Sequence, residues 1–162
     1  ESMLKTNDVS TRISGTAVSA DAHGLKLKGD NKTYRWNSDP DKVQITNYSS
    51  DKESIGTIIK MIADPDVEVY IEARLDDYPN GKAIDVIDVY VRSAEGTLAE
   101  YDDTIRIKTD AGNTFTFNTR NRLTTCDVNG YGQEDLDGTE KGEGAYVKLK
   151  FTKDGLVSDL NS

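Results

Sequence analysis

The sequence contains the same series of short motifs twice, and this internal repeat is the strongest constraint on the fold. The recurring segments are Gly-Thr (15–16 and 96–97), Thr-aromatic-x-aromatic-Asn (33–37 and 114–118) and Gly-x-x-x-Asp (81–85 and 155–159). A general β-pattern would not place three such motifs in the same order twice. We therefore infer that one small module has been duplicated in tandem.

The repeat divides the chain into three parts. These are a polar leader at residues 1–11, a first module at 12–91 and a second module at 92–162. Residues 91–94, at the seam, contain no proline or glycine. We expect the two modules to abut there without a flexible linker.

Within the modules, apolar and polar residues alternate over short segments. Residues 25–28 read Leu-Lys-Leu-Lys, and residues 67–75 alternate over a longer stretch. A period of two predicts strands with one buried face. Residues 50–63 instead carry isoleucines at helical spacing, with Ser50 or Asp51 as the candidate N-cap. The second module shortens this helical segment.

Five or six short strands and one brief helix per module predict an all-β protein. Strands of this length close most economically into a small barrel, so we expect two tandem β-barrel modules of OB-like or SH3-like type. Only the first module is expected to carry a distinct short helix. A single β-sandwich of immunoglobulin type is the alternative, which the repeat and the helix disfavour.

The formal net charge is −9 and the isoelectric point is near 4.6. Nucleic-acid backbones and anionic membranes are bound through excess Lys and Arg, so both are disfavoured as partners. No apolar run approaches the roughly 20 residues of a membrane-spanning helix, and we predict no membrane insertion. The negative surface suits solubility, divalent cations or basic partners.

The second module follows a recognisable order of motifs. Asn-Gly at 129–130 precedes Glu-Asp-Leu at 134–136, an alternating strand at 147–151 and Asp-Gly-Leu-Val-Ser-Asp-Leu at 154–160. This order resembles the β-rich repeat modules that accompany S-layer homology modules in surface proteins of Gram-positive bacteria. The S-layer homology module itself is absent from this chain, and the longer helix of the first module departs from the pattern.

The resemblance implies a secreted, extracellular protein at the cell wall or cell surface. It implies a non-catalytic structural or spacer segment whose partners are other domains of a larger surface protein or cell-wall components. The alternative function is an extracellular binding module for a glycan, calcium or a protein ligand. The resemblance supplies no catalytic residues.

One acidic loop has the oxygen donors of a possible calcium site. The candidate ligands are Asp127, Asn129, Asp135 and Asp137, with further glycines and carboxylates between them. Ca²⁺ prefers six to eight oxygen ligands supplied by such loops. The loop departs from an EF-hand, and a hairpin turn followed by a helical turn explains the same residues. Apart from this possible calcium, we expect no cofactor.

Tyrosines in loops are the candidates for a ligand-binding surface. Tyr48, Tyr78 and Tyr131 each lie outside the alternating strands, where an aromatic ring with a polar tip is available for contact. The other aromatic residues alternate with polar residues, which favours a core position over a carbohydrate-stacking one. These core residues are Tyr34, Trp36, Phe115 and Phe117.

No combination of residues predicts an enzyme. His23 is the single histidine and lies in a turn sequence, and Cys126 is the single cysteine and lies in a strand-like stretch. A lone thiol in a strand is usually a small buried apolar group. Nucleophile, phosphate-binding and metalloprotease motifs are not found in the sequence.

Overall fold

The computed structural model describes residues 10–50 and 53–162, and over these residues the protein is all-β with two short α-helices. The strands join one eleven-stranded sheet that remains open, with β3 at one edge and β9 at the other. The strands are β1 (Ser10–Ala20), β2 (Gly24–Leu27), β3 (Tyr34–Arg35), β4 (Gln44–Asn47), β5 (Val67–Tyr78), β6 (Gly81–Tyr101), β7 (Thr104–Lys108), β8 (Thr114–Asn118), β9 (Thr125–Asp127), β10 (Tyr146–Phe151) and β11 (Val157–Asn161). The helices are the 3₁₀-helix η1 (Pro40–Lys42), α2 (Ile55–Ala63) and α3 (Gln133–Leu136). In the described part, neither α-helix has the length and apolar character needed to cross a membrane.

We call residues 10–91 the first half and residues 92–162 the second half. In the first half, β1 pairs antiparallel with both β2 and β5, and β3 pairs with β2. Strand β5 continues through the turn at Pro79 and Asn80 into β6, and β4 lies parallel to β6. From Val67 to Asp76 in β5, buried residues alternate with half-buried or exposed ones, which reflects the apolar–polar sequence pattern.

The second half uses the same order of pairings. The C-terminal part of β6 pairs with β7 and β10, β8 pairs with β7, and β10 pairs with β11. Strand β9 runs parallel to β11, as β4 runs parallel to β6. Helix α3 precedes β10 as α2 precedes β5. The pairing order therefore follows the sequence repeat.

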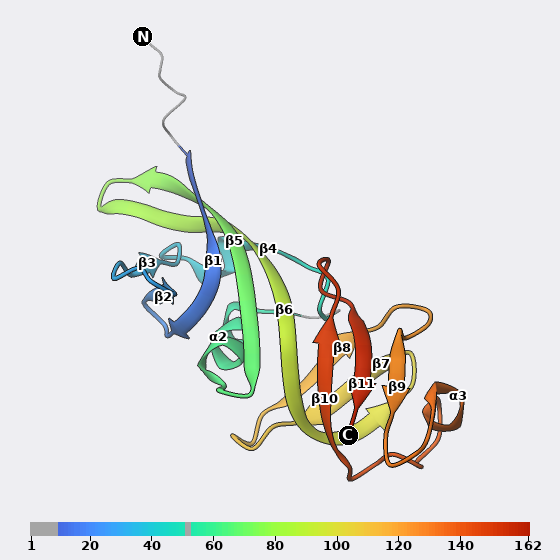
Figure 1. Cartoon of the computed structure of the whole chain (residues 1–162). Coiled ribbons are helices and arrows are strands. Elements are labelled where there is room, and N and C mark those ends of the chain that lie inside the picture. The colour runs from blue at the N-terminus through green and yellow to red at the C-terminus, as the bar shows by residue number, and fades with distance from the viewer. Residues whose placement is uncertain (1–9, 51–52) are drawn as a thin grey trace.

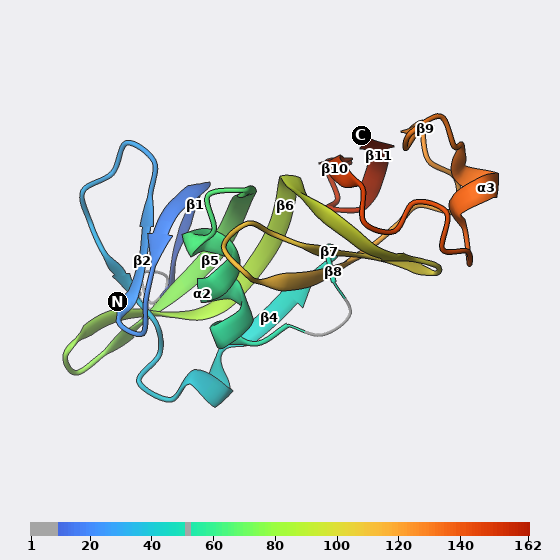
Figure 2. The same ribbon diagram turned by 90° about the horizontal axis from the view of Figure 1, so that it is seen from below.

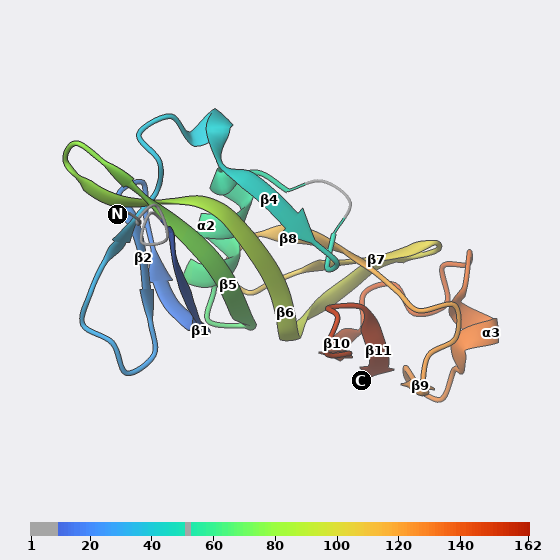
Figure 3. The same ribbon diagram turned by 90° about the horizontal axis from the view of Figure 1, so that it is seen from above.

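Strand β6 belongs to both halves and passes through the seam without a break (Figure 1). Val69 of β5 pairs with Val91 and Glu68 pairs with Ser93, so Arg92 is an extra residue in the ladder. Such a bulge bends a strand and increases its twist. Figures 2 and 3 show the two halves side by side, joined by β6, with the β7–β8 hairpin reaching back toward α2.

The core is built from the inward-facing positions of these strands. Trp36, Phe115 and Phe117 are buried and Tyr34 is half-buried, which confirms that the alternating aromatic residues are core residues. Phe117 also meets Phe151 edge-on, with ring centroids 5.1 Å apart. Aromatic pairs of this geometry add to the stabilisation from burial.

Helix α2 lies within the segment expected to be helical but begins later. Its N-cap is Ser54, whose side chain accepts a hydrogen bond from the N–H of Thr57. Ser50 therefore does not cap it, and Asp51 lies outside the described residues. Strand β1 begins at Ser10, so the last residues of the expected leader belong to a strand, and residues 1–9 lie outside the described part.

The two aromatic segments of the repeat do not occupy equivalent positions. Trp36 forms an isolated parallel bridge with Ile84, and Thr119 forms the corresponding bridge with Val157. The N–H of the following residue donates to the same partner in each case: Asn37 to the carbonyl of Ile84, and Arg120 to the carbonyl of Val157. The counterpart of Trp36 is thus Thr119 and not Phe117, because the second-half hairpin is three residues longer before this bridge.

Candidate functional site

Ser49, in the turn after β4, links the two halves at the seam. Its side chain is fully buried, and its hydroxyl oxygen accepts a 2.9 Å hydrogen bond from the N–H of Val91. Its carbonyl oxygen accepts a 2.8 Å hydrogen bond from the N–H of Asn118 in β8. The side chain of Asn47 accepts a hydrogen bond from the N–H of Ser49 and so fixes the turn after β4.

The β10–β11 turn packs against this serine. Gly155 has φ +88°, and a Cβ atom built on it would lie 2.9 Å from the Ser49 hydroxyl oxygen and 3.5 Å from Cβ of Tyr48. Only glycine adopts this backbone conformation at low cost while also leaving room for the serine. The turn of the second half is therefore fitted to the loop after β4 of the first half.

Asp64 links the two halves at a second place, between α2 and the β7–β8 hairpin. It is 2 % exposed, and its Oδ2 atom accepts hydrogen bonds from the Thr109 hydroxyl and from Nδ2 of Asn113. Its Oδ1 atom accepts a 2.9 Å hydrogen bond from the N–H of Asp66. A buried carboxylate is tolerated where hydrogen bonds of this kind replace its hydration.

Arg92, the bulged residue of β6, makes a third link. Its Nη1 atom donates to the carbonyl of Lys153 at 2.8 Å and to that of Thr152 at 3.4 Å. Its guanidinium carbon lies 4.9 Å from the ring centroid of Tyr70 and 5.7 Å from that of Tyr90. A guanidinium over an aromatic face is attracted by the ring quadrupole.

Three tyrosines lie side by side across neighbouring strands beside Arg92. Tyr70 and Tyr90 are direct partners in the β5–β6 ladder, with ring centroids 6.5 Å apart. Tyr48, which follows β4, stacks on Tyr90 at 6.0 Å with an interplanar angle of 12°. Burial, together with the nearby carboxylates of Asp88 and Glu72, raises the pKa of Tyr90, so its hydroxyl stays protonated at neutral pH.

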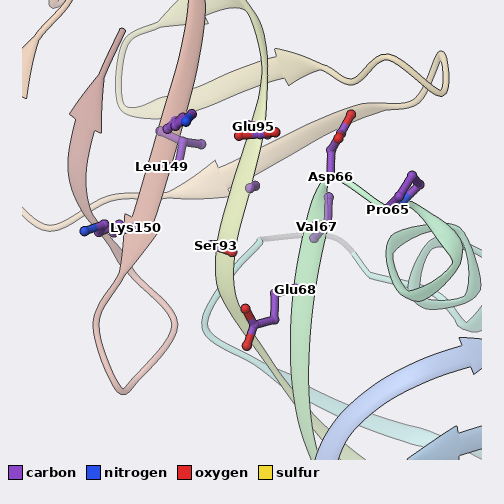
Figure 4. Close-up of a pocket in the computed structure, with 10 residues that line it drawn as sticks. Pro65, Asp66, Val67, Glu68, Ser93, Glu95, Leu149 and Lys150 are labelled. Atoms are coloured by element: carbon purple, nitrogen blue, oxygen red, sulfur yellow. The ribbon is translucent and has the colours of Figure 1, made fainter. Parts of the chain in front are cut away.

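Two hollows lie on this outer face of the sheet, one on each side of the bulge. The smaller one has a volume of about 180 Å³ and is lined by Tyr70, Glu72, Tyr90, Arg92, Lys153 and Asp154. The larger one, of about 350 Å³, is lined by Pro65, Asp66, Val67, Glu68, Ser93, Ala94, Glu95, Lys148, Leu149 and Lys150 (Figure 4). We call the two hollows together the seam groove.

The structure places the three candidate ligand-binding tyrosines in different regions. Tyr48 lies at the seam and is 48 % exposed. Tyr78 lies on the β5–β6 hairpin, where its hydroxyl donates to Asp85 at 2.6 Å and accepts from Nδ2 of Asn37. Tyr131 lies in the second half, 5.7 Å from the Lys141 ammonium group. They do not form one surface.

The side chains of the candidate calcium loop make local hydrogen bonds. Oδ1 of Asp127 accepts from the N–H of Gly130, and Oδ2 of Asp135 accepts from the N–H of Gly132. Asn129 has φ +54° in the turn, and Asp137 is the C-cap of α3. Across residues 10–50 and 53–162, no group of three or more His, Cys, Asp or Glu is arranged to hold a metal ion. Calcium binding by this loop stays a prediction.

The single histidine, His23, lies in a turn, and the single cysteine, Cys126, lies in a strand. The N–H of His23 donates to Oδ1 of Asp21 in the turn between β1 and β2. Cys126 is half-buried in β9, and burial, with a smaller effect from Asp127, raises the pKa of its thiol to about 11. A thiol with such a pKa is a poor nucleophile at neutral pH.

Sequence reasoning did not select Tyr70, Tyr90 or Arg92. The signal was present, because both tyrosines occupy outward positions between buried apolar residues of alternating strands. An aromatic ring on the polar face of such a strand is available for contact.

No family model, no curated protein and no solved structure matches this chain.

Proposed function

We propose that the chain is a non-catalytic structural segment in which two small OB-like barrels form one rigid body. In the first half, β1 pairs with β2 and β5, β2 with β3, and β5 with β6, while the Trp36–Ile84 bridge links β3 to β6. The Thr119–Val157 bridge supports the same circuit in the second half. Five strands with a helix before the fourth are typical of an OB-like barrel.

The observation that carries this proposal is the uninterrupted strand β6. A flexible linker would let the halves move independently, whereas a strand paired on both sides of the seam resists bending. Three contacts join the halves at separate places. Ser49 accepts a backbone hydrogen bond from Asn118, Asp64 accepts one from the Thr109 hydroxyl, and the Arg92 guanidinium lies over the ring of Tyr70. A segment of this kind holds attached domains at a fixed separation and orientation.

The cellular setting of the proposal rests on the motif order of the second half. That order supports an S-layer-associated role at the cell wall or surface of a Gram-positive bacterium, with other domains of a larger surface protein or wall components as partners. The acidic net charge of −9 favours neither nucleic acid nor an anionic membrane as a partner.

A pulsed electron-spin distance measurement tests the rigidity. Spin labels are placed on the exposed positions of Lys32→Cys and Glu140→Cys in a Cys126→Ser background, one label in each half. We expect a single narrow distance distribution, as narrow as that of a control pair at Lys32→Cys and Asp77→Cys within the first half. A broad distribution for the first pair beside a narrow control would overturn the proposal.

A further inference from the structure

The two hollows of the seam groove lie along one face of β6. Tyr90 faces the smaller hollow, while Ser93 and Glu95 face the larger one. The ladders place Glu68 and Lys150 on either side of Ser93, and they place Lys148 beside Glu95. Figure 4 shows side chains from three strands around the larger hollow. The two hollows therefore follow one another along β6 across the seam.

Charges of both signs line the groove in nearly equal number. The larger hollow has the acids Asp66, Glu68 and Glu95 and the bases Lys148 and Lys150. The smaller hollow has the acids Glu72 and Asp154 and the bases Arg92 and Lys153. No sign dominates, so neither a polyanion nor a polycation gains from charge complementarity here.

The lining provides two kinds of contact. Tyr70 and Tyr90, over which Arg92 lies, offer apolar ring surface next to hydroxyl groups. The carboxylates and ammonium groups offer hydrogen-bond acceptors and donors along the whole length. A purely apolar ligand would leave these charged groups without their hydration. A neutral molecule with apolar C–H faces and many hydroxyl groups matches both kinds of contact.

We propose that the seam groove binds a neutral oligosaccharide. A sugar unit lies against Tyr70, Tyr90 and the Arg92 guanidinium in the smaller hollow, and following sugar units place hydroxyls against Glu68, Glu95 and Lys150. The volumes of about 180 and 350 Å³ suit a short oligosaccharide better than a single small solute. Because the smaller hollow is lined by Tyr70 and Tyr90 of the first half and by Lys153 and Asp154 of the second, the site requires both halves to be docked.

The site is tested on the whole chain with immobilised neutral hexasaccharides of glucose, xylose, mannose and N-acetylglucosamine. A hexasaccharide of galacturonic acid is the acidic comparison. Calorimetric titration with the retained sugar then gives the affinity. We expect retention of at least one neutral sugar and weaker or no retention of the acidic one. Absence of retention of every neutral sugar, or retention of the acidic sugar alone, overturns the proposal.

Variants locate the binding. Tyr70→Ala is expected to lower the affinity about tenfold or more, since about 1.4 kcal/mol corresponds to each factor of ten. Lys150→Ala changes an exposed side chain and is expected to lower the affinity severalfold without affecting folding. Tyr131→Ala, which removes an exposed ring outside the groove, is the matched control and is expected to bind normally. Equal effects of Tyr70→Ala and Tyr131→Ala, or a normal affinity for both groove variants, would place binding elsewhere.

Discussion

The N–H of Val91 donates a 2.9 Å hydrogen bond to the hydroxyl of Ser49, which has no exposed surface. Ser49→Ala removes the acceptor and leaves a buried N–H without a partner, at the strand that joins the two halves. We expect a loss of about 1–3 kcal/mol in the free energy of unfolding. Urea denaturation measures it, and Ser38→Ala at an exposed position is the control, with an expected change within about 0.5 kcal/mol.

Gly155 is predicted to be more sensitive to substitution than another glycine of similar backbone conformation. Gly155 has φ +88° and faces Ser49, whereas Gly112 has φ +91° and nothing within 4 Å of a built Cβ. Gly112→Ala should cost about 1–2 kcal/mol from the left-handed conformation alone. Gly155→Ala should cost at least about 1 kcal/mol more, because the seam must also shift. Equal losses in thermal or urea unfolding would show that the turn does not pack tightly on Ser49.

The effects of substituting Asp64 and Thr109 of the β7–β8 hairpin on the free energy of unfolding are predicted to be non-additive. Asp64→Ala leaves the donors of Thr109 and Asn113 without their acceptor, and Thr109→Val removes one of those donors. In a double-mutant cycle, we expect a coupling free energy of about 1–2 kcal/mol. Additive losses would mean that the contact does not stabilise the docking of the two halves.

Glu53 is predicted to make the stability depend on pH. Burial outweighs the hydrogen-bonding groups of Asn47 and Ser50 and raises the pKa of its carboxyl from 4.5 to about 7. Between pH values of about 4.5 and 7, the folded state therefore binds more protons than the unfolded state. The free energy of unfolding falls as the pH rises through this range.

Glu53→Gln should remove this dependence and raise the free energy of unfolding at pH 8 by on the order of 2 kcal/mol. Urea denaturation at pH 5, 6, 7 and 8 measures the difference between the variant and the original protein. A difference that stays constant over these pH values would contradict the expected titration. Glu140→Gln, at an exposed position, is the control.

The thiol of Cys126 is predicted to react slowly in the folded protein. Its pKa of about 11, against an ordinary value of 9.0, leaves about a hundredfold less thiolate at pH 8. Alkylation with iodoacetamide, followed by mass spectrometry, should therefore be at least about a hundredfold slower in buffer than in denaturant. Equal rates would mean that β9 does not shield the thiol.

The alternating sequence pattern was sufficient to predict the main features of the chain. The period of two in β5 and the aromatic alternation at Tyr34, Trp36 and Phe117 predicted strands and core residues, because the burial of one face depends on neighbours two residues apart. The isoleucines of α2 predicted a helix in the same local way. The repeated motif order predicted a duplication, and the strands of the two halves pair in the same order.

The positions that depend on distant partners were decided only by the tertiary structure. Trp36 corresponds to Thr119 and not to Phe117, since the length of the second hairpin sets its register and no local pattern reports it. Tyr48 meets Tyr90 because β4 runs parallel to β6, a pairing between segments far apart in the chain. The sequence thus determined which residues face inward in each repeat. The packing of the two halves around β6 determined which outward-facing residues lie together in the seam groove, because that depends on the bulge at Arg92 and on long-range contacts.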